Sequence, residues 1–265
     1  LLDHIKYPRD YLEKNWDIDP KSLEVDFSPD TFGHSAQIPE IDTFGSVKYY
    51  YHCRACDQPY ALYRMRSPSG EELLMYREQY WYNSAITPAI AAGLIDISRK
   101  CAGFKTGIIV YGVGNHGGGP TRRDIEIALS LKDYPIYPTV KFGTFREFFR
   151  EAEAVRDKLP VIDRELNHIF DGCYTTQSRI KRANRGAENA LYEGRYYSAL
   201  SAMVSGKTKK YLPAQFEKAS QQILFNHFHD ILTGSCVQDT REHAMGLYQD
   251  SMAISNSAAS KALRE

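Results

Sequence analysis

The feature that most constrains the fold of this chain is the alternation of short apolar strands with amphipathic helices in its first part. Period-two alternation and apolar runs predict strands at residues 23–27, 47–52, 72–76, 106–112 and 138–142. Helical spacing predicts helices at residues 7–15, 88–100, 120–131 and 144–156. Strands that alternate with helices favour a parallel sheet covered by helices, with the active site at the carboxyl ends of the strands.

Two of these helices carry clear start signals. Thr144 is followed by Glu147 three residues later, which is the spacing of a capping box. Pro120 is placed near the first turn of its helix, where its missing N–H costs nothing. Both helices are therefore expected to begin close to these residues.

The character of the chain changes after about residue 174. Three consecutive helices without intervening strands are predicted at residues 176–192, 214–227 and 240–263. Three helices in a row suggest a small bundle, so we place a boundary between residues 160 and 175. We expect one domain over residues 1–165 and a helical domain over residues 166–265.

Composition excludes several classes of protein. The 265 residues are 43% hydrophobic and 25% charged, which is ordinary for a globular chain of one or two domains. Basic and acidic residues balance at 33 each, which gives no support to a nucleic-acid partner. No apolar run reaches about 18 residues, so no membrane span is expected. The start at Leu1 is neither a methionine nor a signal peptide, and we expect a piece of a longer chain.

Five cysteines are scattered along the chain. An odd number argues against a disulfide framework and for a reducing compartment, so we expect a cytoplasmic protein. Cys53 and Cys56 have the spacing of a metal or redox pair, but no second pair follows nearby. Two small side chains at a strand end explain the same pattern.

A first polar motif, residues 29–35, begins directly after a predicted strand. It places Asp30 between Pro29 and the turn residue Gly33, in a position suited to catalysis or metal binding. An Asx turn or a helix cap explains the same residues, and local sequence leaves both interpretations open.

A second polar motif covers residues 226–235. His227 and His229 lie two residues apart, so on a regular helix they point to roughly opposite sides. They can share one metal only if the helix ends there, and the turn residue Gly234 indicates an end soon after. His229, which precedes Asp230, is a metal-ligand candidate, and a helix-terminal histidine stabilised by the dipole is the alternative.

Two further features carry weaker signals. Residues 117–119 are three glycines between a strand and a helix, which can bind an anion or let a loop pass close to a ligand. They match neither the P-loop nor the dinucleotide-binding pattern. Tyr174, near the expected boundary, either offers its hydroxyl to a sugar or simply packs.

Four segments, in order along the chain, resemble segments of the family 38 α-mannosidases. Residues 28–39 resemble the family's nucleophile motif, and residues 111–121 resemble a glycine-rich stretch of its microbial and cytosolic members. Residues 165–167 and 172–185 resemble the entry into its helical middle domain, and residues 226–235 resemble its second metal-ligand motif. The resemblance implies an α/β fold: the C-terminal portion of a seven-stranded (β/α) barrel followed by a three-helix bundle.

The resemblance also implies a role for each matching residue. Asp30 would be both a zinc ligand and the nucleophile, His229 a zinc ligand, and Asp230 a partner of substrate hydroxyls. Arg54 and Tyr174 are candidates for substrate contact. A retaining glycosidase needs two carboxyl groups about 5 Å apart, and one Zn²⁺ can hold the sugar's 2- and 3-hydroxyls. Carboxylate oxygen and imidazole nitrogen suit zinc.

Three departures from the family pattern matter. The family's first metal motif, a histidine and an aspartate after an early strand, has no counterpart here and is expected upstream of Leu1. The family's C-terminal β-sandwich domains are also missing after Glu265. Asn115 stands where some relatives carry aspartate, and an amide cannot act as a general acid. The acid/base residue is therefore unassigned, with His116 one candidate.

The leading interpretation is a fragment of a zinc-dependent retaining α-mannosidase that acts on terminal α-linked mannose of a mannoside or oligosaccharide, with no membrane or nucleic-acid partner. The alternative is a non-catalytic carbohydrate-binding or structural remnant of that fold. A metal-dependent hydrolase of another bond shares the ligand types but does not need residues 226–235 in a helical domain. Linkage preference, the metal used in vivo and the oligomeric state, a homo-oligomer included, stay open. We expect the isolated chain to be inactive and to bind zinc poorly.

Overall fold

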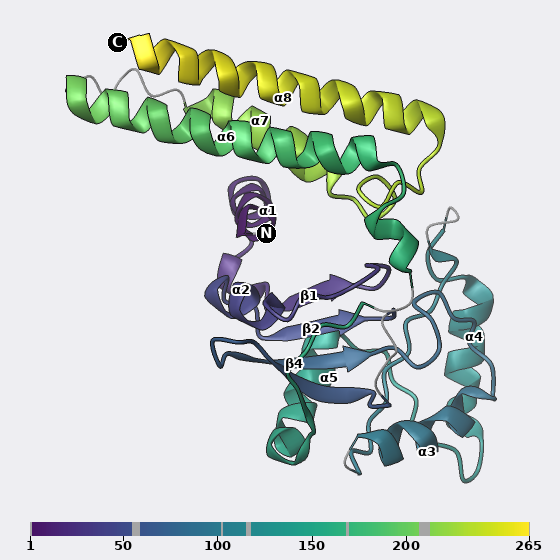
Figure 1. The fold of residues 1–265 in the computed structure, drawn as a ribbon. Helices are drawn as coiled ribbons and strands as arrows, with labels where there is room; N and C mark the ends of the chain where they lie inside the picture. Colours follow the sequence, from purple (N-terminus) through teal and green to yellow (C-terminus); the bar gives the residue numbers. More distant parts are fainter. Residues whose placement is uncertain are drawn as a thin grey trace. The chain divides into compact units, whose positions relative to one another are not determined.

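The computed structural model describes residues 2–54, 59–101, 103–114, 118–167, 170–206 and 213–264. These residues form two compact units, Leu1–Ile169 and Phe170–Glu265 (Figure 1). The first, the sheet unit, is a mixed α/β structure, and the second, the helical unit, contains three long helices. Cys56, Asn115, His116 and Gly117 lie outside the described residues. Within the described ranges, every helix is too short or too polar to cross a bilayer.

The sheet unit is built on five strands in the order β1-β2-β4-β3-β5. Their bounds are β1 Val25–Ser28, β2 Tyr49–His52, β3 Leu62–Arg66, β4 Glu72–Arg77 and β5 Val161–Ile162. The arrows of β1, β2 and β4 run in the same direction, with Val25 opposite Tyr49 and Tyr49 opposite Leu74 (Figure 1). β3 is antiparallel to β4 and parallel to β5, so the expectation of a parallel sheet is corrected to a mixed one. The turn closed by Ser67 N–H and Glu71 C=O is too short for a parallel crossover.

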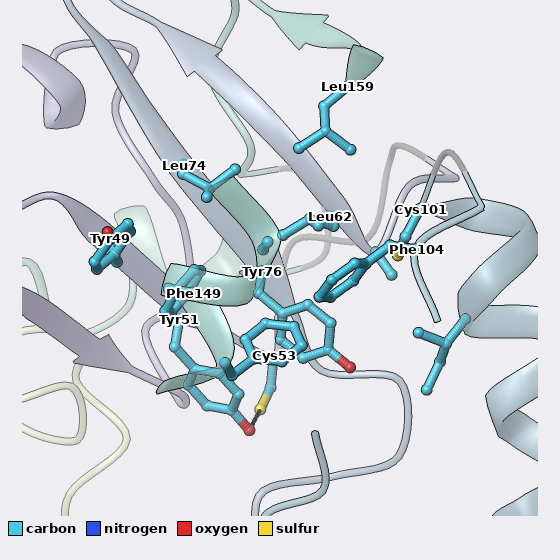
Figure 2. Packing of buried hydrophobic residues seen from close by; sticks show 14 residues of the cluster. Tyr49, Tyr51, Cys53, Leu62, Leu74, Tyr76, Cys101, Phe104, Phe149 and Leu159 are labelled. Atoms are coloured by element: carbon cyan, nitrogen blue, oxygen red, sulfur yellow. Dashed lines mark hydrogen bonds between the residues drawn. The ribbon is translucent and has the colours of Figure 1, made fainter. Parts of the chain in front are cut away.

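Helices cover both faces of this sheet because its strands are apolar on both sides. Alternate residues of β2 and β4 go to opposite faces. One face packs on α3 (Ile90–Lys100) and α5 (Phe145–Ala152), and Figure 2 shows this cluster. The ring of Phe149 stacks on Tyr49 with centroids 4.8 Å apart. The other face, which includes Tyr50 and Met75, packs on α2 (Ile38–Phe44).

The predicted helices are present in the sheet unit, and the capping box is confirmed. α1 spans Leu2–Trp16 and α4 spans Arg122–Ser130, which begins after the cap residue Thr121. At α5, the Thr144 hydroxyl accepts from Glu147 N–H while the Glu147 carboxylate accepts from Thr144 N–H. Short 3-10 turns follow at Pro20–Ser22, Leu131–Asp133 and Glu153–Lys158.

Two predicted strands are wrong. Residues 138–142 form no strand, and residues 106–112 make only an isolated bridge between Ser84 and Tyr111. The apolar run at 106–112 packs Ile108 and Val110 against the core, while its backbone bonds go to a loop and to the Tyr76 hydroxyl. Packing of one side of this half-buried run against the core therefore explains its apolar residues, without a neighbouring strand.

The helical unit contains the three long helices that the sequence predicts. They are α6 (Ser178–Ser205), α7 (Pro213–Asn226) and α8 (Gln238–Arg264), preceded by the 3-10 turn Asp171–Tyr174. Their shared core includes Ile180, Phe216 and Tyr248. α6 and α8 approach closely at Gly194, where an added Cβ would lie 2.8 Å from the Ser255 carbonyl oxygen. That approach explains a glycine in the middle of a helix.

Candidate active site

Three polar side chains of the sheet unit follow the ends of three neighbouring parallel strands. Asp30 comes after β1, Arg54 after β2 and Tyr82 after β4. Carboxyl ends of parallel neighbours meet at one edge of a sheet, which is where α/β folds bind ligands. The three side chains are in fact in contact.

Asp30 is held through both carboxylate oxygens. The Arg54 guanidinium donates to Oδ1 through Nε and pairs with it through Nη2, and the Tyr82 hydroxyl donates to Oδ2 at 3.0 Å. The side chains of Asp30 and Arg54 are only 14% and 19% exposed. A charge-assisted, partly desolvated pair of this kind fixes the carboxylate in one orientation.

Aromatic rings flank Arg54. Its guanidinium carbon lies 4.9 Å from the ring centroid of Phe32 and 5.1 Å from that of Trp81. Cation–π contacts at these distances add to the ion pair and shield it from water. Asp30, Arg54, Tyr82, Phe32 and Trp81 are called the Asp30 cluster below.

A buried polar layer lies next to the Asp30 cluster. His34 Nδ1 bonds the Tyr50 hydroxyl at 2.9 Å, and His52 Nε2 bonds the Tyr63 hydroxyl at 2.7 Å. His52 Nδ1 also bonds the main-chain carbonyl of Arg54 at 2.8 Å. Burial lowers the pKa of His34 to about 4 and the pKa of His52 well below its ordinary value, so both rings are neutral at physiological pH.

Cys53 belongs to the core. Its thiol lies 3.5 Å from the Tyr51 hydroxyl, and burial raises the pKa of the thiol to about 12. A buried, protonated thiol of this kind is a poor nucleophile at neutral pH, which fits the alternative of a small side chain at a strand end. The Tyr51 hydroxyl donates to the buried Glu78, whose pKa is raised by burial.

In the helical unit, α7 ends at Asn226, and the two histidines that follow separate. His227 is turned into the unit, where Nε2 lies 2.9 Å from Asn184 Oδ1 and 3.2 Å from Glu188 Oε1. His229 sits in the turn after the helix with its ring 4.2 Å from that of Phe228. The internal contacts of His227 leave His229 as the better ligand candidate of the two.

The turn that carries His229 and Asp230 is fixed by short-range bonds. The Thr233 hydroxyl donates to the His229 carbonyl oxygen, and the Ser235 hydroxyl donates to Asp230 Oδ1 at 3.1 Å. Gly234 has a φ of +82°, and an added Cβ would lie 2.8 Å from Thr176 O. Gly234 therefore brings this turn against the segment that begins at Tyr174, a tyrosine that is 51% exposed.

The five site residues expected from sequence fall into two groups. Asp30 and Arg54 are in direct contact in the sheet unit, whereas His229, Asp230 and Tyr174 belong to the helical unit. Sequence reasoning missed the other members of the Asp30 cluster, Tyr82, Trp81 and Phe32. The run Tyr80-Trp81-Tyr82 directly after β4, at the functional edge of a parallel sheet, was the available signal.

The donors present suit zinc in type but not in number. Asp30 supplies carboxylate oxygen and His229 imidazole nitrogen, both ordinary zinc ligands, but a protein site uses three or four. No group of three or more His, Cys, Asp or Glu within the described ranges can hold a metal. The described residues alone do not complete a zinc site.

The two units of the chain correspond to two domains of a known family. Residues 1–165 match the Glycosyl hydrolases family 38 N-terminal domain, and residues 168–265 match the Alpha mannosidase middle domain. The chain belongs to glycosyl hydrolase family 38.

Similar proteins come from animals, an amoeba and bacteria. Alpha-mannosidase 2C1 of Homo sapiens is 27% identical over 88% of this chain and 23% of its own length. Alpha-mannosidase G of Dictyostelium discoideum is 29% identical over 84% and 21%. The crystal structure of an alpha-mannosidase from Enterococcus faecalis V583 superposes with a TM-score of 0.74 at 19% identity, over 95% of this chain and 30% of that one. The chain thus spans under a quarter of these curated relatives, and the bacterial structure shows the fold alone.

Proposed function

We propose that this chain is part of a retaining α-mannosidase that cleaves terminal α-linked mannose from a mannoside or oligosaccharide. The observation that carries the proposal is the Asp30 cluster: a carboxylate at the strand ends, held through both oxygens and largely shielded from water. The family membership and the relatives named as alpha-mannosidases supply the substrate class.

Asp30 takes the role of nucleophile in this proposal. Retaining glycosidases attack the anomeric carbon with a carboxylate to form a covalent glycosyl-enzyme, which water then hydrolyses. Arg54 and Tyr82 orient the carboxylate and stabilise its charge until attack. Each carboxylate oxygen accepts from one of these donors and keeps a second lone pair with which it can attack the sugar. The aromatic rings of Phe32 and Trp81 limit the access of water to the ion pair.

We propose that Asp30 and His229 each act as a zinc ligand, as the family resemblance implies, with further donors outside the described residues. Bound there, the metal would hold the 2- and 3-hydroxyls of the sugar and favour ring distortion. Asp230, whose Oδ1 accepts from the Ser235 hydroxyl, and the exposed Tyr174 are proposed to bind substrate hydroxyls. Arg54 is proposed to contact the substrate as well, beside its ion pair with Asp30.

The barrel and the cell compartment follow as parts of the same proposal. We infer that the five-stranded sheet is the C-terminal portion of a seven-stranded (β/α) barrel and that the three helices form its bundle domain. A cytoplasmic location is supported by the odd number of cysteines and by Cys101, Cys173 and Cys236, which form no disulfide among the described residues. The alternative, a non-catalytic carbohydrate-binding remnant, is favoured by one observation: Asn115 replaces a residue that is acidic in some relatives.

The test is hydrolysis of 4-nitrophenyl α-mannoside by the full-length parent protein, with and without a chelator, beside an Asp30→Asn variant. Loss of the nucleophile should lower kcat by about a thousand-fold or more, because nucleophile and base act as a unit. His227→Gln serves as the matched control for His229→Gln, since only His229 is proposed to bind metal. A folded, zinc-loaded parent without turnover would leave the binding remnant as the better account.

A further inference from the structure

The two loops that carry Asp30 and Arg54 are joined by a pair of buried histidines, His34 and His52. His34 ends the Asp30 loop, and its main chain is fixed by two hydrogen bonds with Leu166, at 2.8 and 3.0 Å. His52 is the last residue of β2, two positions before Arg54. Both side chains are at most 1% exposed, and their ring centroids lie 4.6 Å apart.

The hydrogen bonds of His52 fix its tautomer. The carbonyl oxygen of Arg54 can only accept, so His52 Nδ1 must carry the proton in their 2.8 Å bond. A neutral imidazole has one N–H, so Nε2 accepts, and the Tyr63 hydroxyl donates to it at 2.7 Å. The chain of bonds therefore runs in one direction, from the Tyr63 hydroxyl through His52 to Arg54.

The position of the Arg54 side chain depends on its backbone. The guanidinium is fixed at its far end by Asp30 and by the rings of Phe32 and Trp81. The near end is fixed by the His52 bond to the carbonyl oxygen of the same residue. A displaced Arg54 backbone would therefore have to be compensated by the side chain, at the expense of its contacts with Asp30 and the two rings.

We propose that His52, with Tyr63 behind it, is a positioning residue that holds the Arg54 backbone so that the guanidinium stays on the nucleophile Asp30. His34 supports the same arrangement from the Asp30 loop through its ring contact with His52. His52 does not touch substrate in this account and acts only through Arg54. The inference deepens the proposed glycosidase function and rests on it for its kinetic consequence.

Two substitutions separate the two bonds of His52. The amide nitrogen of asparagine occupies the place of Nδ1, so His52→Asn keeps the donor to Arg54 and loses the contact with Tyr63. The amide of glutamine reaches the place of Nε2, so His52→Gln keeps a partner for Tyr63 and loses the bond to Arg54. Both variants replace the imidazole by a smaller or more flexible amide in the same buried site. A general loss of stability should therefore occur in both, and each variant is the control for the other.

The first readout is independent of turnover: the rate at which phenylglyoxal modifies Arg54 in the full-length parent, located by peptide mass spectrometry. We expect slow modification in the wild type and in His52→Asn, and modification several times faster in His52→Gln. Equal reactivity of Arg54 in all three proteins, or acceleration that follows loss of stability alone, would overturn the positioning role.

The second readout is steady-state kinetics on 4-nitrophenyl α-mannoside. His52→Gln should lower kcat about 10-fold to 100-fold with little change in KM, the usual cost of losing a supporting contact, and His52→Asn should retain most of kcat. An inactive wild-type parent with the expected Arg54 reactivities would reject the proposed function but keep the positioning role. Equal kcat in both variants would reject the positioning role in catalysis.

Discussion

The sheet unit and the helical unit present their candidate site residues by different means. Asp30 and Arg54 are brought together by the register of three parallel strands and stand on a layer of fully buried polar side chains. His229 and Asp230 are placed by the end of one helix and by hydrogen bonds within a single turn. The sheet unit therefore depends on long-range packing for its site, and the helical unit on local geometry.

The same difference extends to ionisable groups. The sheet unit buries Asp42, His34, His52 and Glu78 almost completely. In the helical unit, the pair His227 and Glu188 keeps side-chain exposures of 18% and 29%. Stability of the sheet unit should consequently respond to pH and to lost hydrogen bonds more strongly than stability of the helical unit.

The largest expected effect is the response of Asp42 to pH. Burial raises its pKa to about 8, helped by Asp26, while Arg9 opposes the shift. Because the pKa is higher in the folded state, protonated Asp42 stabilises the fold. This contribution is complete below about pH 4. As pH rises to 8 it is lost, by up to about 1.4 kcal/mol per pH unit. His34 acts in the opposite direction, since its lowered pKa costs stability as pH falls from about 6.5 to 4.

Urea unfolding is compared at pH 6.5 and 8, because His34 is neutral in both states over most of that window. The difference between wild type and Asp42→Asn then gives the contribution of Asp42. In Asp42→Asn, the free energy of unfolding should fall less between pH 6.5 and pH 8 than in wild type. The variant should be more stable than wild type at pH 8. Asp250→Asn, an exposed aspartate of the helical unit paired with Lys218, is the matched control and should leave the slope unchanged. If the free energy of unfolding changed equally with pH in all three proteins, the sheet unit would not respond to pH more strongly than the helical unit.

The next effect compares two buried tyrosine hydroxyls. Tyr51 donates to the carboxylate of Glu78 at 2.9 Å, whereas Tyr248 donates to the amide oxygen of Asn184 at 3.2 Å. Tyr51→Phe should cost about 2–3 kcal/mol because it takes a donor from a buried acid, and Tyr248→Phe only about 1 kcal/mol. Denaturant unfolding of both variants measures the two losses in unfolding free energy. Equal losses would show that the two hydroxyls stabilise their units to the same extent.

A close helix approach gives the third effect, this time within the helical unit. Gly194→Ala forces a Cβ to within 2.8 Å of the Ser255 carbonyl oxygen and 3.1 Å of the Phe216 ring, and should cost about 1–3 kcal/mol. Gly246→Ala on α8 meets nothing within 4 Å and should stabilise by about 0.5–1 kcal/mol. Thermal unfolding distinguishes the two variants. If Gly194→Ala left the free energy of unfolding unchanged, α6 and α8 could move apart at little cost in free energy.

The smallest effect concerns how helices begin in each unit. Thr144→Ala removes the capping box of α5 and should cost about 1 kcal/mol. Gln177 precedes α6 without a side-chain cap bond, so Gln177→Ala should change stability by less than about 0.5 kcal/mol. Chemical denaturation of both variants checks the pair, and a larger cost for Gln177→Ala would show that this side chain supports the turn at Gly234.

Much of the fold follows from local sequence, and the exceptions have physical causes. The capping box at Thr144, the helix end at Asn226 and the strands around Val25, Tyr49 and Leu74 are set by short-range patterns. β3 was not predicted because Leu62–Arg66 mixes buried and charged residues, and its antiparallel pairing with β4 is a long-range outcome. Residues 106–112 have strand-like composition, but only tertiary packing decides whether a partner strand is present.

Local sequence predicts some features of the candidate site, and tertiary structure decides the others. Asp30 was found from its place after a strand, and Arg54 lies after the neighbouring strand. Their contact, and the donation from Tyr82, depend on the order β1-β2-β4, which no local pattern encodes. In the helical unit, the separation of His227 from His229 required knowing that Asn184 and Glu188 lie on the adjacent helix face.

The most direct test of the account is covalent trapping of the nucleophile. A fluorinated α-mannosyl fluoride, which slows the hydrolysis of the glycosyl-enzyme, would be incubated with the full-length parent and the digest examined by mass spectrometry. The account predicts one added sugar on the peptide that contains Asp30, and none in Asp30→Asn. A label on a different carboxylate in an active enzyme would contradict the assignment of Asp30 as the nucleophile.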